Sequence, residues 1–86
     1  MFKIFSKPNC TFCTQAKQLL ASKDISFEEL VIDVGQEKQD GVKYVQASDL
    51  KELVPTAKTV PQIFFNESHI GGFTELKKYL SDNATV

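Results

Sequence analysis

The stretch SKPNCTFCTQAK, residues 6–17, contains both cysteines of the chain, Cys10 and Cys13. A disulfide that closes so short a loop removes little chain entropy, so a purely structural bond is a poor interpretation. A zinc site normally takes four protein ligands, or three with an open position, and the chain adds only one histidine, His69. The spacing therefore favours a redox pair of the C-x-x-C type and leaves a metal shared between chains as an alternative.

The composition is that of an ordinary globular protein. The chain has 86 residues, of which 42% are hydrophobic and 24% charged, and its formal net charge is -1. These values predict a single domain over residues 1–86, with no electrostatic attraction to nucleic acid or to a membrane surface. The apolar runs are far shorter than the roughly 20 residues of a transmembrane helix, and no secretory signal is visible. We therefore expect a cytoplasmic protein without a nucleic-acid or membrane partner.

The first third of the chain shows a strand, a helix and a second strand. FKIF, residues 2–5, is a short apolar run typical of a buried strand. From Thr11 to Ser22 the apolar residues recur at helical spacing, with Cys13 on the apolar face. FEELVID, residues 27–33, predicts a second strand. A strand, a helix and a strand in succession imply a parallel pair with a right-handed crossover.

A second helix and a hairpin follow. SDLKELV, residues 48–54, has an apolar face and a capping residue in Ser48, and a proline ends it. PQIFF, residues 61–65, and ESHI, residues 67–70, predict two strands joined by a tight turn.

The chain ends in a third predicted helix. TELKKYL, residues 74–80, places leucines one turn apart, with Thr74 as the expected N-cap. Residues 35–47 show no readable pattern. The expected fold is therefore α/β, in the order β-α-β-α-β-β-α, with a four-stranded mixed sheet and helices on its faces.

The two cysteines are expected in different environments. Cys10 lies where the first strand meets the first helix, as the N-cap or the first helical residue. Unpaired backbone N–H groups and the helix dipole favour a thiolate there, and Lys7 adds positive charge three residues earlier. Cys13 is one turn further, on the core-facing side. This spacing fits a mechanism in which Cys10 attacks a disulfide and Cys13 then attacks Cys10 to release the product.

Three motifs, in this order, resemble those of glutaredoxins. SKPNCTFC (residues 6–13) resembles the family active site, usually C-P-Y-C after a basic residue, TVPQIF (59–64) resembles its T-V-P strand start, and HIGGFTEL (69–76) its I-G-G turn. The resemblance covers nearly the whole chain and is to the small dithiol glutaredoxins of bacteria and phages. It implies a thioredoxin-like fold and reduction of protein disulfides and glutathione mixed disulfides. Glutathione is then the co-substrate, and no tightly bound cofactor is expected.

The resemblance also implies a glutathione site. The residues that match the family's binding positions are Lys7, Phe12, Thr59, Val60, Pro61, Gly72, Phe73 and Thr74. The family's proline follows a cis peptide bond, so we expect a cis bond between Val60 and Pro61. The Val60 N–H and C=O would then pair with glutathione as with an added strand. The plainer alternative is an ordinary trans proline at a strand edge.

Each end of glutathione has its own expected partners. By resemblance, Lys7 faces the glycine carboxylate, while Phe73 and Thr74 hold the γ-glutamyl end. The paired glycines allow close approach of the ligand, and a helix N-terminus attracts a carboxylate. Phe12 lines the cleft where the family most often has tyrosine. The alternatives are a plain turn for the glycines and an ordinary surface aromatic for Phe12.

Thr11 departs from the family pattern, which usually has proline between the cysteines. Threonine restores a backbone donor and adds a hydroxyl near Cys10, which changes the surroundings of the thiolate. Some dithiol glutaredoxins without that proline hold a [2Fe-2S] cluster between two chains, with glutathione as co-ligand. A cluster carrier with Cys10 as a ligand is therefore one alternative. The monothiol C-G-F-S class does not match, because Cys13 is present.

A second alternative is a redoxin that serves ribonucleotide reductase and is recharged by thioredoxin reductase. Such proteins share the KPNC lead-in but lack the I-G-G turn and this T-V-P context, so the motifs at 59–64 and 69–76 favour a glutaredoxin. Ribonucleotide reductase remains a candidate partner, beside glutathione and other proteins that contain disulfides. We expect a monomer, and a structural role for His69, for which the sequence indicates no partner.

Overall fold

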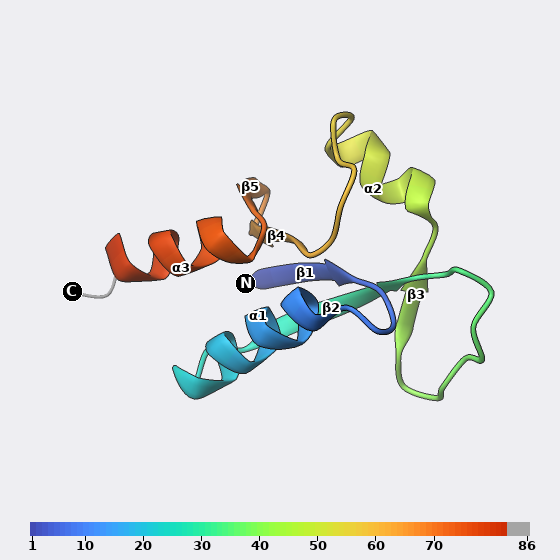
Figure 1. Cartoon of the computed structure of the whole chain (residues 1–86), viewed down its shortest axis with the longest axis horizontal. Coiled ribbons are helices and arrows are strands. Elements are labelled where there is room, and N and C mark those ends of the chain that lie inside the picture. Colours follow the sequence, from blue (N-terminus) through green and yellow to red (C-terminus); the bar gives the residue numbers. More distant parts are fainter. Residues whose placement is uncertain (83–86) are drawn as a thin grey trace.

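The computed structural model describes residues 1–82 (Figure 1). In chain order its elements are β1 (Phe2–Ser6), α1 (Thr11–Ser22), β2 (Phe27–Ile32), β3 (Lys43–Val45), α2 (Ala47–Leu53), β4 (Gln62–Phe65), β5 (Ser68–Gly71) and α3 (Phe73–Asp82). The strands form one sheet in the order β3-β2-β1-β4-β5. Strands β1, β2 and β3 run parallel, whereas β4 is antiparallel to both β1 and β5. The expected mixed α/β sheet is confirmed.

Helices cover both faces of this sheet. α1 and α3 pack on one face, where the buried cluster comprises Phe2, Ile4, Ala16, Leu20, Ile63, Leu76 and Leu80. α2 packs on the other, where the cluster comprises Phe5, Ile32, Leu50, Val54, Ala57 and Phe64. Successive residues of a strand point to opposite faces, which is why Ile4 and Phe5 join different clusters. None of the helices within residues 1–82 has the length and apolar content to cross a bilayer.

The sheet has five strands, one more than the sequence predicted. The additional strand, β3, falls in the segment 35–47 that showed no readable pattern. It has three residues and pairs along one edge only, with Tyr44 opposite Val31 of β2. So short an edge strand buries too little to leave an alternating apolar pattern in the sequence.

The expected cap of the second helix is wrong. α2 begins at Ala47, so Ser48 lies inside its first turn, and the N-cap is Gln46. The backbone N–H of Gln46 donates to Asp49 Oδ2 at 2.8 Å. The carboxylate of Asp49, the third residue of the helix, thus accepts from the N-cap backbone as in a capping box.

The third helix shows the same correction. α3 begins at Phe73, so Thr74 is its second residue and not its cap. The N–H of Gly72 donates to Glu75 Oε1 at 2.7 Å. The Glu75 carboxylate thus stabilises the start of α3, where it also meets the positive end of the helix dipole.

Candidate active site

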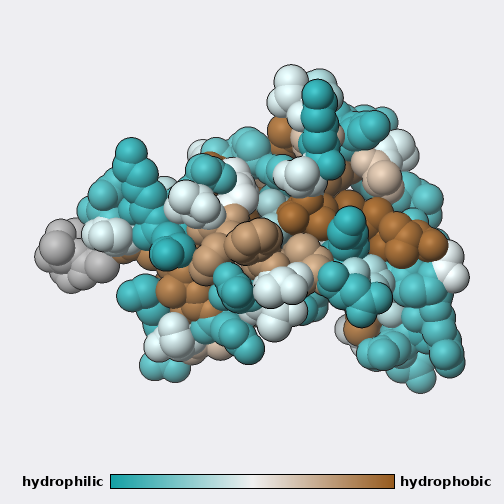
Figure 2. Space-filling view, in the orientation of Figure 1, coloured by the Kyte–Doolittle hydropathy of each residue, from teal (hydrophilic) through white to brown (hydrophobic). Residues whose placement is uncertain are grey.

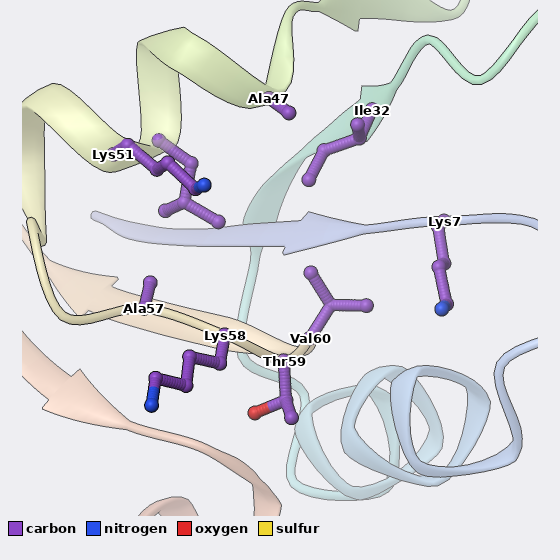
Figure 3. Close-up of a pocket in the computed structure, with 9 residues that line it drawn as sticks. Lys7, Ile32, Ala47, Lys51, Ala57, Lys58, Thr59 and Val60 are labelled. Atoms are coloured by element: carbon purple, nitrogen blue, oxygen red, sulfur yellow. The ribbon is translucent and has the colours of Figure 1, made fainter.

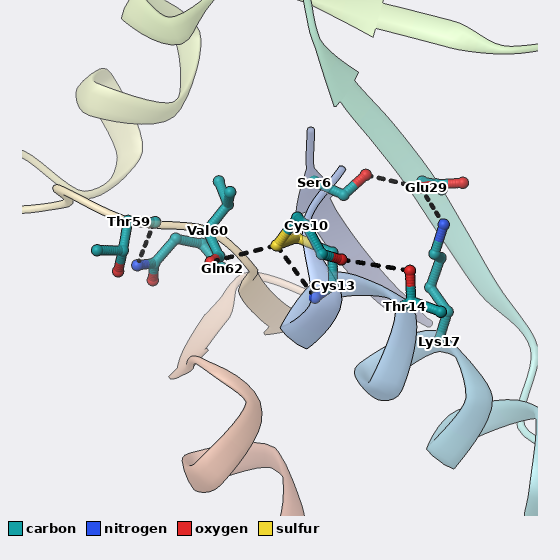
Figure 4. The surroundings of a disulfide bond; sticks show 9 residues. All are labelled: Ser6, Cys10, Cys13, Thr14, Lys17, Glu29, Thr59, Val60 and Gln62. Carbon is teal, nitrogen blue, oxygen red and sulfur yellow. Dashed lines mark hydrogen bonds and ion pairs between the residues drawn. A yellow bond between two sulfur atoms is a disulfide. The ribbon is translucent and has the colours of Figure 1, made fainter. Parts of the chain in front are cut away.

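Cys10 is the N-cap of α1, as expected, and has extended backbone angles of φ -108 and ψ 107. Its sulfur forms a disulfide with Cys13, with the Cα atoms 5.2 Å apart, and lies 3.2 Å from the Cys13 backbone nitrogen (Figure 4). Cys13 is 1% exposed, whereas Cys10 is only partly buried. The structure is thus that of the oxidised form. In it, Cys10 Sγ accepts a hydrogen bond from the Cys13 N–H in the first helical turn.

The loop before β4 meets this disulfide. Cys10 Sγ lies 3.7 Å from the carbonyl oxygen of Val60 (Figure 4). The peptide bond between Val60 and Pro61 is cis, as the resemblance implied. The T-V-P segment and the cysteine pair, far apart in sequence, therefore form one site.

A buried side chain holds this loop in place, and the sequence did not indicate it. Gln62 is 9% exposed, and its Nε2 donates to the Thr59 carbonyl oxygen at 2.9 Å. Its Oε1 lies 2.7 Å from His69 Nε2, so His69 has a partner after all. The ring of His69 also lies 4.9 Å from that of Phe64. A chain of hydrogen bonds thus connects strand β5 to the Thr59–Val60 backbone.

The paired glycines bring the start of α3 beside the same loop. Gly71 has φ +128, and a Cβ there would lie 2.8 Å from Glu75 Cβ, so no other residue fits without strain. A Cβ on Gly72 would lie 3.5 Å from the Pro61 carbonyl oxygen. The structure therefore requires glycine at position 71, whereas a side chain at position 72 would crowd only Glu75 Oε1, at 3.2 Å.

Two aromatic side chains flank the site. Phe12 is 59% exposed, and its ring lies 6.1 Å from that of Phe73 at the start of α3. Lys77 Nζ lies 5.5 Å from the Phe73 ring centroid. Figure 2 shows apolar side chains gathered on this face between α1 and α2, with hydrophilic residues around them. Phe12 and Phe73 thus form an aromatic pair between the start of α1 and the start of α3.

The remaining predicted residue, Lys7, lies at the rim of a neighbouring pocket. This pocket also contains Thr59 and Val60 in its lining (Figure 3). Lys7, Thr59 and Val60 are thus brought together on one side. Thr74 is exposed in the first turn of α3, next to Phe73 in the chain.

Comparison with known proteins decides the family. Residues 2–70 match the sequence model of the glutaredoxin family. The chain belongs to the glutaredoxin family. Glutaredoxin 3 of Escherichia coli is 40% identical over 74 residues, which are 86% of this chain and 78% of that protein. The hybrid peroxiredoxin hyPrx5 of Haemophilus influenzae is 42% identical over 91% of this chain, which spans only 28% of that longer protein.

Solved structures agree on the fold of this glutaredoxin. Glutaredoxin 1 from Francisella tularensis superimposes with a TM-score of 0.73 at 33% identity, over 99% of this chain and 96% of that one. A buckwheat glutaredoxin in complex with glutathione gives a TM-score of 0.69 at 25% identity, over 95% of this chain and 69% of that one. The thioredoxin-like fold is therefore confirmed. A glutaredoxin with its cysteine pair at disulfide distance is a thiol–disulfide oxidoreductase.

A charged network lies on the other side of α1. Ser6 Oγ donates to Glu29 Oε2 at 2.6 Å, and Lys17 Nζ donates to the same oxygen at 2.8 Å (Figure 4). Burial raises the pKa of the Glu29 carboxyl, but the bonds from Lys17 and Ser6 lower it, and the net pKa lies below its usual value. Glu29 and Lys17 line a cavity of about 490 Å³ that Cys10 and Cys13 also reach. No pattern in the sequence indicated this network.

A metal site at the cysteine pair is the alternative to a redox pair. Within residues 1–82 no three His, Cys, Asp or Glu side chains come close enough together to hold a metal ion. The donors that this chain brings to a [2Fe-2S] cluster are its cysteine sulfurs, of which Cys10 is the more accessible. A cluster would need its other ligands from glutathione or from a second chain.

Proposed function

We propose that this chain is a glutathione-dependent oxidoreductase that reduces protein disulfides and glutathione mixed disulfides through Cys10 and Cys13. The observation that carries the proposal is the place of the Cys10 sulfur. It lies at the N-terminus of α1 and 3.7 Å from the carbonyl oxygen of Val60. A peptide joined to Cys10 by a disulfide is thereby held beside a backbone segment with which it can pair as an added strand.

The chemistry of glutathione fits the groups around Cys10. Its cysteine backbone would pair with Val60, and its glycine carboxylate would meet the charge of Lys7. Its γ-glutamyl carboxylate would lie at the start of α3, where the first N–H groups of a helix have no intrahelical partner. Phe12 and Phe73 would border the ligand. The buckwheat glutaredoxin solved with glutathione supports the choice of ligand.

For a glutathione mixed disulfide, one cysteine is sufficient. The Cys10 thiolate attacks the glutathione sulfur, forms a Cys10–glutathione disulfide and releases the substrate protein as a thiolate. A second glutathione thiolate then attacks the glutathione sulfur of this adduct. Glutathione disulfide leaves, and Cys10 returns as a thiolate.

For a protein disulfide, both cysteines act. Cys10 attacks one sulfur of the substrate, and the other leaves as a thiolate that takes up a proton. Cys13 loses its proton and attacks Cys10 Sγ, which releases the substrate's second thiol and leaves the Cys10–Cys13 disulfide. Two glutathione molecules then restore the dithiol through a mixed disulfide at Cys10.

The protein partner, the oligomeric state and two alternative functions can each be tested. We propose ribonucleotide reductase as one protein substrate, and a monomer as the active form, on the resemblance to small dithiol glutaredoxins. The cluster carrier and the redoxin recharged by thioredoxin reductase remain the alternatives. Visible absorbance after anaerobic purification would favour the cluster carrier.

A coupled assay tests the proposal. The reduced protein is combined with a glutathione mixed disulfide, glutathione, glutathione reductase and NADPH, and NADPH loss is followed by absorbance. We expect rapid turnover that disappears in Cys10→Ser. Absence of turnover, with activity restored when thioredoxin reductase replaces glutathione and its reductase, would overturn the proposal in favour of the redoxin.

A further inference from the structure

A basic pocket adjoins the proposed glutathione site. Its volume is about 370 Å³. Three lysines, Lys7, Lys51 and Lys58, stand around it, over an apolar lining that includes Ile32, Leu50 and Val60 (Figure 3). The lysines come from three separate segments: the loop before α1, helix α2 and the loop before β4. The fold thus gathers three positive charges that the sequence keeps apart.

None of these three lysines forms an ion pair within residues 1–82. Of the seven lysines elsewhere in the chain, four form ion pairs with carboxylates, namely Lys3, Lys17, Lys38 and Lys43. Lys7, Lys51 and Lys58 form none with the described part of the chain, and no Asp or Glu lines their pocket. Lys7 also borders the neighbouring cavity, whose lining includes Glu29 and Glu37, so Lys51 and Lys58 carry most of the local excess. Like charges around one pocket repel each other, so an anionic ligand is stabilised there. This pocket is therefore positively charged although the net charge of the whole chain is -1.

The pocket lies along the path of a bound substrate. It shares Val60 with the active site, and the Val60 carbonyl oxygen is 3.7 Å from Cys10 Sγ. In the proposed pose the residue that follows the substrate cysteine points toward Lys7, as the glycine of glutathione does. The carboxylate of glutathione ends there. A longer peptide continues by about 3.3 Å per residue and so reaches Lys51 and Lys58 within a few residues.

We propose that this pocket selects protein substrates that carry Asp or Glu within three residues after the reactive cysteine. The inference rests on the proposed function, because it uses the same pairing with Val60. The carboxylates of such a substrate meet Lys51 and Lys58, and their methylene groups lie over the apolar lining. Exposed ion pairs are individually weak, so we expect two of them to raise the second-order rate constant about fivefold at low ionic strength.

Two synthetic peptides test this preference. Each has one cysteine and is used as its symmetric disulfide, so that either half can join Cys10. One peptide has Glu at the second and third positions after the cysteine, and the other has Gln. The rate of disulfide reduction by the reduced protein is measured in single turnover, without glutathione. We expect the wild type to reduce the Glu peptide about fivefold faster, and salt to diminish the difference.

Matched variants locate the effect. Lys51→Gln with Lys58→Gln removes two charges from the pocket, and Lys23→Gln with Lys78→Gln removes two exposed charges outside its lining. Both variants have the same net charge. The preference should disappear in the first variant and persist in the second. Equal rates for both peptides with the wild type, or a preference that survives in the first variant, would overturn the inference.

This result is separable from the proposed function. Turnover of a glutathione mixed disulfide by the wild type, in the coupled assay, reports only on the proposed function. The peptide comparison reports only on the basic pocket, because no glutathione is present. A wild type that turns over glutathione mixed disulfides but shows no preference between the peptides would leave the proposed function intact and refute the pocket's selectivity.

Discussion

The sulfur of Cys10 lies 3.7 Å from the carbonyl oxygen of Val60, a residue 50 positions later in the chain. Because the contact is to the backbone, the geometry does not depend on the valine side chain. It does depend on the loop before β4 and on the start of α1.

The first prediction concerns the two cysteines. Cys10→Ser should reduce both the deglutathionylation and the protein-disulfide activities to the uncatalysed background, because no thiolate remains at the start of α1. Cys13→Ser should keep deglutathionylation and lose protein-disulfide reduction. Both activities are measured with glutathione as reductant, one on a glutathionylated peptide and one on a protein disulfide. Equal losses in both variants, on both substrates, would refute this division of labour.

The second prediction concerns the link from β5 to the active-site loop. Gln62→Leu removes the donor to the Thr59 carbonyl and the partner of His69, and the net loss is about 0.5–1.5 kcal/mol per hydrogen bond. We expect the KM for a glutathione mixed disulfide to rise about threefold to tenfold, with kcat nearly unchanged, because the loop positions substrate without reacting.

A control variant separates the two bonds of Gln62. His69→Phe keeps an aromatic ring against Phe64 but loses the bond to Gln62, while the bond from Gln62 to Thr59 remains. Its KM should therefore change less than that of Gln62→Leu. If both variants lower the unfolding midpoint and leave KM as in the wild type, Gln62 stabilises the fold without positioning the loop.

The third prediction concerns Gly71. Gly71→Ala places a Cβ 2.8 Å from Glu75 Cβ, at a φ of +128 that other residues rarely adopt. We expect a loss of about 1–3 kcal/mol in the free energy of unfolding, measured with urea. Gly35→Ala is the control, since it also has a positive φ, +89, but meets no atom within 4 Å. A loss in the control as large as that in Gly71→Ala would show that crowding against Glu75 is unimportant.

The fourth prediction concerns pH. The pKa of Glu29 is lower in the folded protein than its ordinary value of 4.5, so its charged form stabilises the fold. That contribution is fully present above about pH 4.5 and is lost as the pH falls through the lower, folded pKa. Glu29→Gln should therefore lose stability at pH 7 and differ less from the wild type at pH 3. The urea midpoint at the two pH values measures this.

A surface carboxylate provides the comparison for Glu29. Glu52 is exposed on α2 and forms no ion pair with the described residues. Glu52→Gln should have the same urea midpoint as the wild type at both pH values. A constant difference between Glu29→Gln and the wild type from pH 7 to pH 3 would contradict the assignment of the effect to the Glu29 charge.

Local features of the site were predictable from the sequence. Cys10 at the start of α1 follows from a turn that precedes a helical pattern, and the burial of Cys13 follows from helical spacing. The cis bond before Pro61 was predicted through the family resemblance. Each of these depends on residues within one short segment.

Features that depend on how distant segments meet were not predicted. The bond between Gln62 and His69 requires the register of the β4–β5 hairpin, which places Phe64 opposite His69. The network of Ser6, Lys17 and Glu29 joins three elements. A hairpin register deduced from the tight turn would have placed Gln62 and His69 on one face, because residues two apart in a strand share a face. For the network around Glu29, the sequence contains no pattern that would predict which residues meet.

The most direct test of the account is to observe where glutathione lies. In Cys13→Ser, reaction with glutathione disulfide should give a stable mixed disulfide at Cys10, and ¹H–¹⁵N spectra can be compared before and after. We expect the largest amide shifts at Val60 and at the first residues of α3, with Glu29 little affected. Shifts centred on Glu29 and Tyr44, which line the cavity on the other side of α1, would contradict it.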